Sequence, residues 1–358
     1  MANLTSLQDM RGSSQTVADT SLFGPHTMNG PWGLDSRLKL VALACDFFNV
    51  KKIAAHHATI GKALSKQGNP TPLTAADFLQ YLHVKSVFPK APNAFRVARI
   101  LERMVSTGLL VHVGSGSSSV TGLQNHYIYA LTPHDARRGL FRLVPVLGPQ
   151  YLFRLCEPGL VHITGTNAKG DEVAGTGLVV DSRHILTCRH VVSDMTVNPR
   201  QTFQGSQYAV DHGSIRRHTG VDVAVVPVEG PPLSPLDGAL MQAPVVGMTV
   251  YTLGYPKLPG LRDASLTMQQ GAVTNQAVAS LTGERLFLYS AISRPGNSGG
   301  PVVSEDGYVV GLASVDATGL YGADEAFSPH YAGIPAQVVV HAVQDLGLGI
   351  ELPFEHYE

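Results

Sequence analysis

SRPGNSGGPVV, residues 293–303, is the stretch that decides the fold and chemistry of the second half of the chain. Glycines on both sides of Ser298 permit a tight turn that points backbone N–H groups into a small cavity. A serine hydroxyl becomes a nucleophile when a base takes its proton, and the oxyanion that forms needs donors already in place. We therefore predict Ser298 as a nucleophile, with an oxyanion hole made by the N–H groups of Gly296 and Ser298 and with Asn297 between them. The alternative is a glycine-rich turn that holds an incidental serine.

Two further motifs supply the partners that such a serine needs. TCRHVV, residues 187–192, ends a strand-like run and offers His190 as the general base. The chain has 15 histidines, so His190 is selected by its context and not by composition. VDVAVVPV, residues 221–228, opens with Asp222 ahead of apolar residues, where an unpaired carboxylate would be costly. Accepting a hydrogen bond from the histidine Nδ1 would satisfy Asp222, and the order His, Asp, Ser is that of chymotrypsin-type enzymes.

The residue pattern after about Tyr151 predicts an all-β domain. Short Val/Ile/Leu runs alternate with clusters of Gly, Pro, Asn and Asp, which is typical of a β-barrel or a β-sandwich. One helical pattern, from Ala336 to Asp345, follows these strands.

Residues 158–348 resemble the trypsin-like peptidase domain of HtrA-type proteases. The resemblance lies in GTGLVVDSRHILTCRHVV (175–192), VDVAVVPV, AISRPGNSGGPVV (291–303) and YAGIPAQVVVHAV (331–343). It implies two six-stranded β-barrels with His190, Asp222 and Ser298 in the cleft between them, and it implies hydrolysis of peptide bonds in protein or peptide substrates.

The resemblance also implies where substrate would bind. Ile292 would form the floor of the primary specificity pocket, and Ser314, Val315 and Asp316 would form the strand that pairs with the substrate backbone. An apolar floor favours a small or aliphatic residue before the scissile bond. Asp316 or Asp324 would instead attract a basic side chain, and both alternatives stay open.

The cysteines, the N-terminal residues and the hydropathy of the chain bear on its cofactors and its cellular location. Cys45, Cys156 and Cys188 are too few for a disulfide framework and have no metal-ligand spacing, so we expect no metal, no cofactor and a reducing cytoplasm. Cys188 is predicted as a small buried residue. The start MANLTSLQDMRGSS does not read as a signal peptide, no segment is apolar enough to cross a membrane, and no PDZ domain follows the protease segment, so we do not carry over periplasmic quality control. Gly175-Thr176-Gly177 is too short for a phosphate-binding loop and favours the start of a strand.

The 358 residues suit two domains that differ in charge. Residues 1–150 carry 15 Lys/Arg against 7 Asp/Glu, a formal charge of +8, and residues 151–358 carry 11 against 20, a formal charge of −9. This asymmetry indicates different partners for the two parts or an attraction between them. We divide the chain into a flexible arm (1–30), a winged-helix-like regulatory or interaction domain (31–145) and the protease domain (151–358).

The winged-helix prediction rests on several helices followed by a two-stranded ribbon. Helical spacing covers Arg37–Phe48, Lys51–Lys66, a segment capped by Thr74 that ends at Leu82, and Asn93–Ser106; strand patterns cover Leu109–Val113 and His126–Leu131. RVARILERMVSTGLLVHVGSG…HYIYALTP loosely resembles the recognition helix and wing of bacterial winged-helix regulators.

Arg96, Arg99 and Arg103 share one face of the last helix, where they could meet DNA phosphate or guanine. The loop GSGSSSVTGLQN that would form the wing has no Lys or Arg, which argues against DNA and favours a protein-interaction surface. Two hypotheses follow. The first is a cytoplasmic serine endopeptidase whose N-terminal domain binds a regulatory protein. The second is a DNA-binding regulator whose protease domain cleaves itself or is inert.

Overall fold

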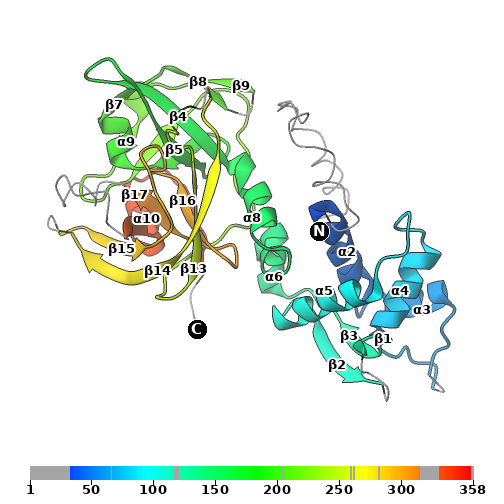
Figure 1. Cartoon of the computed structure of the whole chain (residues 1–358). Coiled ribbons are helices and arrows are strands. Elements are labelled where there is room, and N and C mark those ends of the chain that lie inside the picture. Colours follow the sequence, from blue (N-terminus) through cyan, green and yellow to red (C-terminus); the bar gives the residue numbers. More distant parts are fainter. Residues whose placement is uncertain are drawn as a thin grey trace. The chain divides into compact units, whose positions relative to one another are not determined.

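The computed structural model describes residues 33–65, 67–116, 121–203, 205–258, 260, 263–280, 283–314 and 330–355. The chain divides into two compact units, residues 1–139 with 145–147 and residues 140–144 with 148–358 (Figure 1). The predicted arm, residues 1–30, lies outside the described residues.

The first unit consists of helices and a small antiparallel sheet. Its elements are α2 (Leu34–Phe47), α3 (Ile53–Ile60), β1 (Leu73–Thr74), α4 (Ala75–Val84), α5 (Ala94–Ser106), β2 (Val111–Ser115), β3 (Asn125–Ile128) and α6 (Pro133–Arg138). The strands lie in the order β1-β3-β2, so the predicted ribbon gains a third strand. This confirms a helical N-terminal part, and the winged-helix assignment stays a prediction.

Local signals explain where these helices begin and end. Thr74 accepts a hydrogen bond from the N–H of Asp77, whose carboxylate accepts from Thr74, and this capping box starts α4 as predicted. The helix α3 is much shorter than expected, because Gly61 adopts φ +67° and ends it before Lys66. Aromatic rings from α2, α4 and β3, among them Phe47, Phe78 and Tyr127, pack in the core.

A run of short helices connects the two sets of strands and was not predicted. It comprises the 3-10 helix η3 (Gly139–Leu143), α7 (Val144–Leu147), α8 (Pro149–Cys156) and the 3-10 helix η4 (Glu157–Gly159). Proline stands at the first or second position of α7, α8 and η4, where a backbone N–H would make no hydrogen bond within the helix.

The second unit begins with a six-stranded antiparallel sheet. Its strands are β4 (Leu160–Asn167), β5 (Glu172–Val179), β6 (His184–Thr187), β7 (Met195–Val197), β10 (Arg216–Arg217) and β11 (Ala224–Pro227), in the order β10-β11-β6-β5-β4-β7. A hairpin of β8 (Arg200–Phe203) and β9 (Ser206–Ala209), the short helix α9 (Arg189–Ser193) and the 3-10 helix η5 (His212–Ser214) belong to the same half.

The remaining eight strands of the described residues form a second sheet, and six of them close into a barrel. The eight strands are β12 (Met241–Gln242), β13 (Thr249–Gly254), β14 (Thr267–Ala279), β15 (Arg285–Tyr289), β16 (Pro301–Ser304), β17 (Val309–Ser314), β18 (Tyr331–Pro335) and β19 (Phe354–Glu355). The pairing of β16 with β17 closes the ring β13-β14-β15-β18-β17-β16 around buried residues such as Val250, Phe287 and Val310. Helix α10 (Ala336–Asp345) has the bounds that the sequence predicts. Helices followed by a β-barrel domain confirm the predicted fold class, and among the described strands the pairings close one of the two barrels that the resemblance implies.

Candidate active site

His190 and Asp222 form a directly bonded pair. His190 lies in α9, immediately after β6, and Asp222 lies two residues before β11, which pairs with β6. The Nδ1 atom of His190 is 2.7 Å from Oδ2 of Asp222, and the backbone N–H of His190 donates to Oδ1 at 2.8 Å. These two contacts hold the imidazole with Nδ1 toward the carboxylate, the orientation that a histidine base requires.

The carboxylate of Asp222 is ionised in this setting. Asp222 is only 7% exposed, and burial by itself raises its pKa. The hydrogen bonds and charge of His190 and the hydroxyl of Ser314 outweigh burial, so the pKa of Asp222 lies below its usual value. A negative carboxylate next to Nδ1 would stabilise a positive charge on the imidazole of His190.

Arg189 fixes the loop that carries Asp222, a role that sequence reasoning missed. Its guanidinium donates to the carbonyl oxygens of His218 at 3.1 Å and Thr219 at 2.8 Å. The ring of His218 in turn accepts hydrogen bonds from the N–H groups of Gly220 and Val221. This loop is therefore folded against the helix that carries His190.

Ser298 and His190 line the same cavity. The cavity measures about 310 Å³, and its walls also include Gly296 and Pro295 from the nucleophile loop. Its other walls come from β4, β5 and the α9–β7 segment, through Asn167, Val173, Ala174, Val191, Asp194 and Met195. The hydrogen bond between a serine nucleophile and its base often shortens only when substrate binds, so the shared cavity is the feature that pairs the two residues.

The loop around Ser298 presents two backbone donors. Gly296 adopts φ +102°, and the N–H of Asn297 donates to the carbonyl of Arg294 at 2.8 Å. The N–H groups of Gly296 and Ser298 have no acceptor in the part of the chain that the structure describes. Asn297 therefore closes the turn while the N–H groups on either side of it stay available, as an oxyanion hole requires.

The predicted specificity residues are only partly described. Ile292 is 44% exposed and does not line the cavity that holds Ser298. Ser314 ends β17, opposite Ala332 of β18, and its hydroxyl donates to Asp222. Val315, Asp316 and Asp324 lie outside the described residues.

Among the described residues, one cluster of three side chains, which includes Cys188, could hold a metal ion. The Sγ atom of Cys188, a ring nitrogen of His190 and a carboxylate oxygen of Asp222 all lie within 4.8 Å of one another. The sequence offered no ligand spacing around Cys188, because Asp222 is distant in the chain. The thiol is buried and donates to the carbonyl of Ala313 at 3.3 Å, and the other two groups are joined to each other, so hydrogen bonds account for the arrangement.

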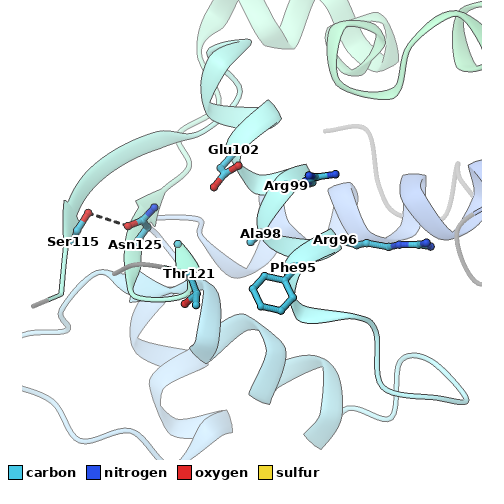
Figure 2. A pocket seen from close by; sticks show the side chains of 9 residues that line it. Phe95, Arg96, Ala98, Arg99, Glu102, Ser115, Thr121 and Asn125 are labelled. Atoms are coloured by element: carbon cyan, nitrogen blue, oxygen red, sulfur yellow. Dashed lines mark hydrogen bonds between the residues drawn. The ribbon is translucent and has the colours of Figure 1, made fainter. Parts of the chain in front are cut away.

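Arg96 and Arg99 of the first unit line a separate groove of about 680 Å³ between α5 and the β2–β3 hairpin. Figure 2 shows Arg96 and Arg99 extending from one side of α5, while Glu102 extends from the other side, toward the hairpin. Arg103 donates through Nε to the carbonyl of Pro145 at 3.0 Å. Of the three predicted nucleic-acid contacts, the groove is lined by Arg96 and Arg99, and Arg103 binds the connecting segment.

Comparisons with known proteins find similarity to peptidases. Residues 175–312 match the family described as "Trypsin-like peptidase domain". The chain is 27% identical over 216 residues to Protease Do-like 1, chloroplastic, from Arabidopsis thaliana, across 54% of this chain and 46% of that protein. It is 25% identical over 257 residues to the magnetosome formation protease MamE from Paramagnetospirillum magneticum, across 68% of this chain and 33% of that protein. The chain thus spans less than half the length of these curated relatives.

Solved protease structures are also similar. The active form of the Rv3671c protease from M. tuberculosis is 20% identical with a TM-score of 0.43, over 57% of this chain and 86% of that one. The serine endoprotease from Yersinia pestis is 19% identical with a TM-score of 0.40, over 55% and 65%. Residues 175–312 therefore match a trypsin-like peptidase domain, and both of these curated relatives are described as proteases.

Proposed function

We propose that the second unit hydrolyses peptide bonds with Ser298 as nucleophile, His190 as general base and Asp222 as the residue that orients the histidine. The observation that carries this proposal is the 2.7 Å contact between His190 Nδ1 and Asp222, made while His190, Ser298 and Gly296 line one cavity. The trypsin-like peptidase match covers all of these residues.

The steps follow from the geometry. His190 Nε2 takes the proton of Ser298 as Oγ attacks the scissile carbonyl, and the N–H groups of Gly296 and Ser298 stabilise the oxyanion. The imidazolium, held by Asp222, then gives its proton to the leaving amine. A water molecule repeats the sequence on the acyl-enzyme and releases the second product.

The substrate would be a protein or a peptide. Ile292 next to the nucleophile loop supports a preference for an aliphatic residue before the scissile bond, since it offers no charge to a basic side chain. Pairing of the substrate backbone with Ser314, Val315 and Asp316 belongs to the same proposal.

The first unit, on this proposal, binds a regulatory protein and controls the peptidase. Its support is the separate groove beside α5, which has a polar lining and an exposed Phe95. A cytoplasmic location belongs to the same proposal, and fractionation of cells would test it. No helix in the described ranges is long and apolar enough to span a membrane.

A serine-directed fluorophosphonate tests the central claim. The full chain should be labelled at pH 8, and Ser298→Ala should not be labelled. Ser304→Ala is the matched control, because Ser304 is equally buried but accepts a hydrogen bond from Tyr308 N–H in β16–β17. No labelling of a folded wild-type chain would refute an active peptidase.

Regulation is tested by the labelling rate of the chain that begins at residue 140, the first residue of the second unit, compared with the full chain. Thermal unfolding of both chains checks that the peptidase unit folds. Equal rates, with and without candidate partner proteins, would contradict control by the first unit.

A further inference from the structure

Thr176 is a fully buried polar residue at the centre of the peptidase unit, and the proposed chemistry leaves it without a role. It lies in β5, opposite His162 of β4, and is 0% exposed. A buried hydroxyl in a β-sheet is retained only where its hydrogen bonds are made. Its partners therefore indicate what it does.

All the polar groups of Thr176 are bonded around the nucleophile loop. Its N–H donates to the carbonyl of Ser298 at 2.9 Å, and its hydroxyl donates to the carbonyl of Gly296 at 2.6 Å. The hydroxyl also accepts from the N–H of Tyr255 at 2.9 Å. The carbonyl of Thr176 accepts from the hydroxyl of Thr187 at 2.8 Å.

These contacts fix the middle of three consecutive peptide groups. The carbonyl of Pro295 accepts from Lys257 N–H at 3.0 Å, and the carbonyl of Asn297 accepts from Gly300 N–H at 2.9 Å. Because a peptide group is planar, each carbonyl that is held determines where the following N–H points. The outer two groups carry the N–H donors of Gly296 and Ser298, and the hydroxyl of Thr176 holds the group between them.

The middle group needs such a restraint because Gly296 has no Cβ and its backbone rotates easily. A rotation there would turn the Gly296 carbonyl away from Thr176 and shift the donors on both sides. The hydroxyl of Thr176 in the six-stranded sheet, 120 residues away in the chain, prevents this rotation. The same hydroxyl also accepts from the N–H of Tyr255, which follows β13 of the closed barrel.

The two glycines that flank Thr176 bring β5 close enough to its neighbours for this contact. A Cβ on Gly175 would lie 2.6 Å from Cγ1 of Val191, and a Cβ on Gly177 would lie 2.3 Å from Cγ2 of Ile185. The Gly-Thr-Gly stretch is therefore neither a phosphate loop nor the start of a strand. It lies inside β5 and packs tightly behind the catalytic loop.

We propose that Thr176 is a positioning residue for the oxyanion hole, acting through its hydroxyl on the Gly296–Asn297 peptide group. This inference rests on the proposed peptidase function, because an oxyanion forms only during acyl transfer. It predicts that loss of the hydroxyl lowers the rate of the chemical step and leaves substrate binding nearly unchanged.

The test compares Thr176→Val, which removes the hydroxyl and keeps the shape, with Thr176→Ser, which keeps the hydroxyl. Removal of one oxyanion donor costs about 100-fold to 1,000-fold in kcat, so a displaced donor should cost about 10-fold to 100-fold. We expect this loss for Thr176→Val, both in fluorophosphonate labelling and in kcat on a fluorogenic peptide with valine before the scissile bond, with KM within about twofold. Thr176→Ser should recover the wild-type value to within about threefold.

The matched control is Thr164→Val. Thr164 lies in the adjacent strand β4, and its hydroxyl bonds to Gln201 and Asn198, not to the nucleophile loop. It should label at the wild-type rate. A slower Thr176→Ser than Thr176→Val would mean that the methyl group matters and the hydroxyl does not, which overturns the inference.

Hydrogen exchange of the full chain separates this inference from the proposed function. In Thr176→Val, or in Thr176→Ala should the valine variant not fold, amides of residues 294–300 should exchange faster while those of β4 stay unchanged. A wild-type chain that is not labelled refutes the peptidase. Unchanged exchange in residues 294–300 refutes the positioning role, whether or not the chain is active.

Discussion

Ser314 donates a hydrogen bond from its hydroxyl to Oδ2 of Asp222 at 3.1 Å. Ser314 ends β17 of the closed barrel, and Asp222 precedes β11 of the first sheet, so the bond links the two halves of the peptidase unit. Oδ2 is also the atom that His190 Nδ1 contacts. The carboxylate thus receives donors from both sides, which explains how it stays ionised while buried.

Ser314→Ala removes one of these donors. We expect the pKa of Asp222 to rise toward its usual value and kcat to fall about tenfold to 100-fold, since a hydrogen bond to a charged group contributes about 1.5–3 kcal/mol and each 1.36 kcal/mol is a factor of about ten. The pH–rate profile would show an acid limb displaced to higher pH. Ser304→Ala, a buried serine outside this network, should leave the profile unchanged.

Asp222→Asn keeps the shape of the side chain and removes its charge. We expect kcat to fall about 10³-fold to 10⁴-fold, because the amide favours the wrong tautomer of His190. Fluorophosphonate labelling should slow in parallel. A variant that retains more than a tenth of the wild-type rate would contradict the assignment of Asp222.

The same variant should change how stability depends on pH. The pKa of Asp222 in the folded chain is below its usual 3.8, so its contribution to stability is complete above that pH and is lost as the pH falls through the lower, folded value. Wild type should therefore lose more stability than Asp222→Asn between pH 4 and its acid transition. Urea unfolding at a series of pH values measures this difference, and parallel curves would contradict it.

The sequence predicts the site where the chemistry is local and misses it where the contacts are long-range. Ser298, Gly296 and His190 stand in short motifs whose residue types match the roles proposed for them. The contact of Thr176 with Gly296 joins residues 120 apart, and that of Ser314 with Asp222 joins residues 92 apart. Because the partners are so distant in the chain, no local spacing in the sequence predicts these two contacts. Likewise, helical spacing extended to Lys66, but a left-handed Gly61 ended the helix earlier.

Gly299→Ala should disrupt the nucleophile loop. Gly299 adopts φ +83°, and a Cβ there would lie 2.2 Å from Oγ1 of Thr187 and 2.3 Å from the carbonyl oxygen of Thr176. Left-handed backbone costs an alanine about 1–2 kcal/mol, and the contact with backbone adds to it. We expect a lower Tm and loss of fluorophosphonate labelling. Gly170→Ala, with φ +86° and no atom within 4 Å of the new Cβ, controls for the backbone strain alone.

Ile292→Asp tests which side chain the peptidase accepts before the scissile bond. With Ile292 in place, we expect fluorogenic peptides with valine or leucine there to be cleaved faster than those with arginine. The aspartate variant should raise kcat/KM for the arginine peptide about twofold to fivefold, because Ile292 is 44% exposed and solvent partly screens a charge pair there. A wild-type preference for arginine would assign specificity to another residue, such as Asp316 or Asp324.

Arg96, Arg99 and Arg103 distinguish the two hypotheses for the first unit. If this unit binds a protein partner, duplex DNA should bind weakly and equally to wild type and to the double variant Arg96→Ala/Arg99→Ala. If it binds DNA, the double variant should weaken binding and reduce the slope of log K against log[salt] by about two, one for each arginine that no longer neutralises a phosphate. Arg103→Ala is the informative third variant, because its Nε donates to Pro145. We expect it to lower the Tm by a few degrees without changing the salt slope, as measured by fluorescence anisotropy on a labelled duplex.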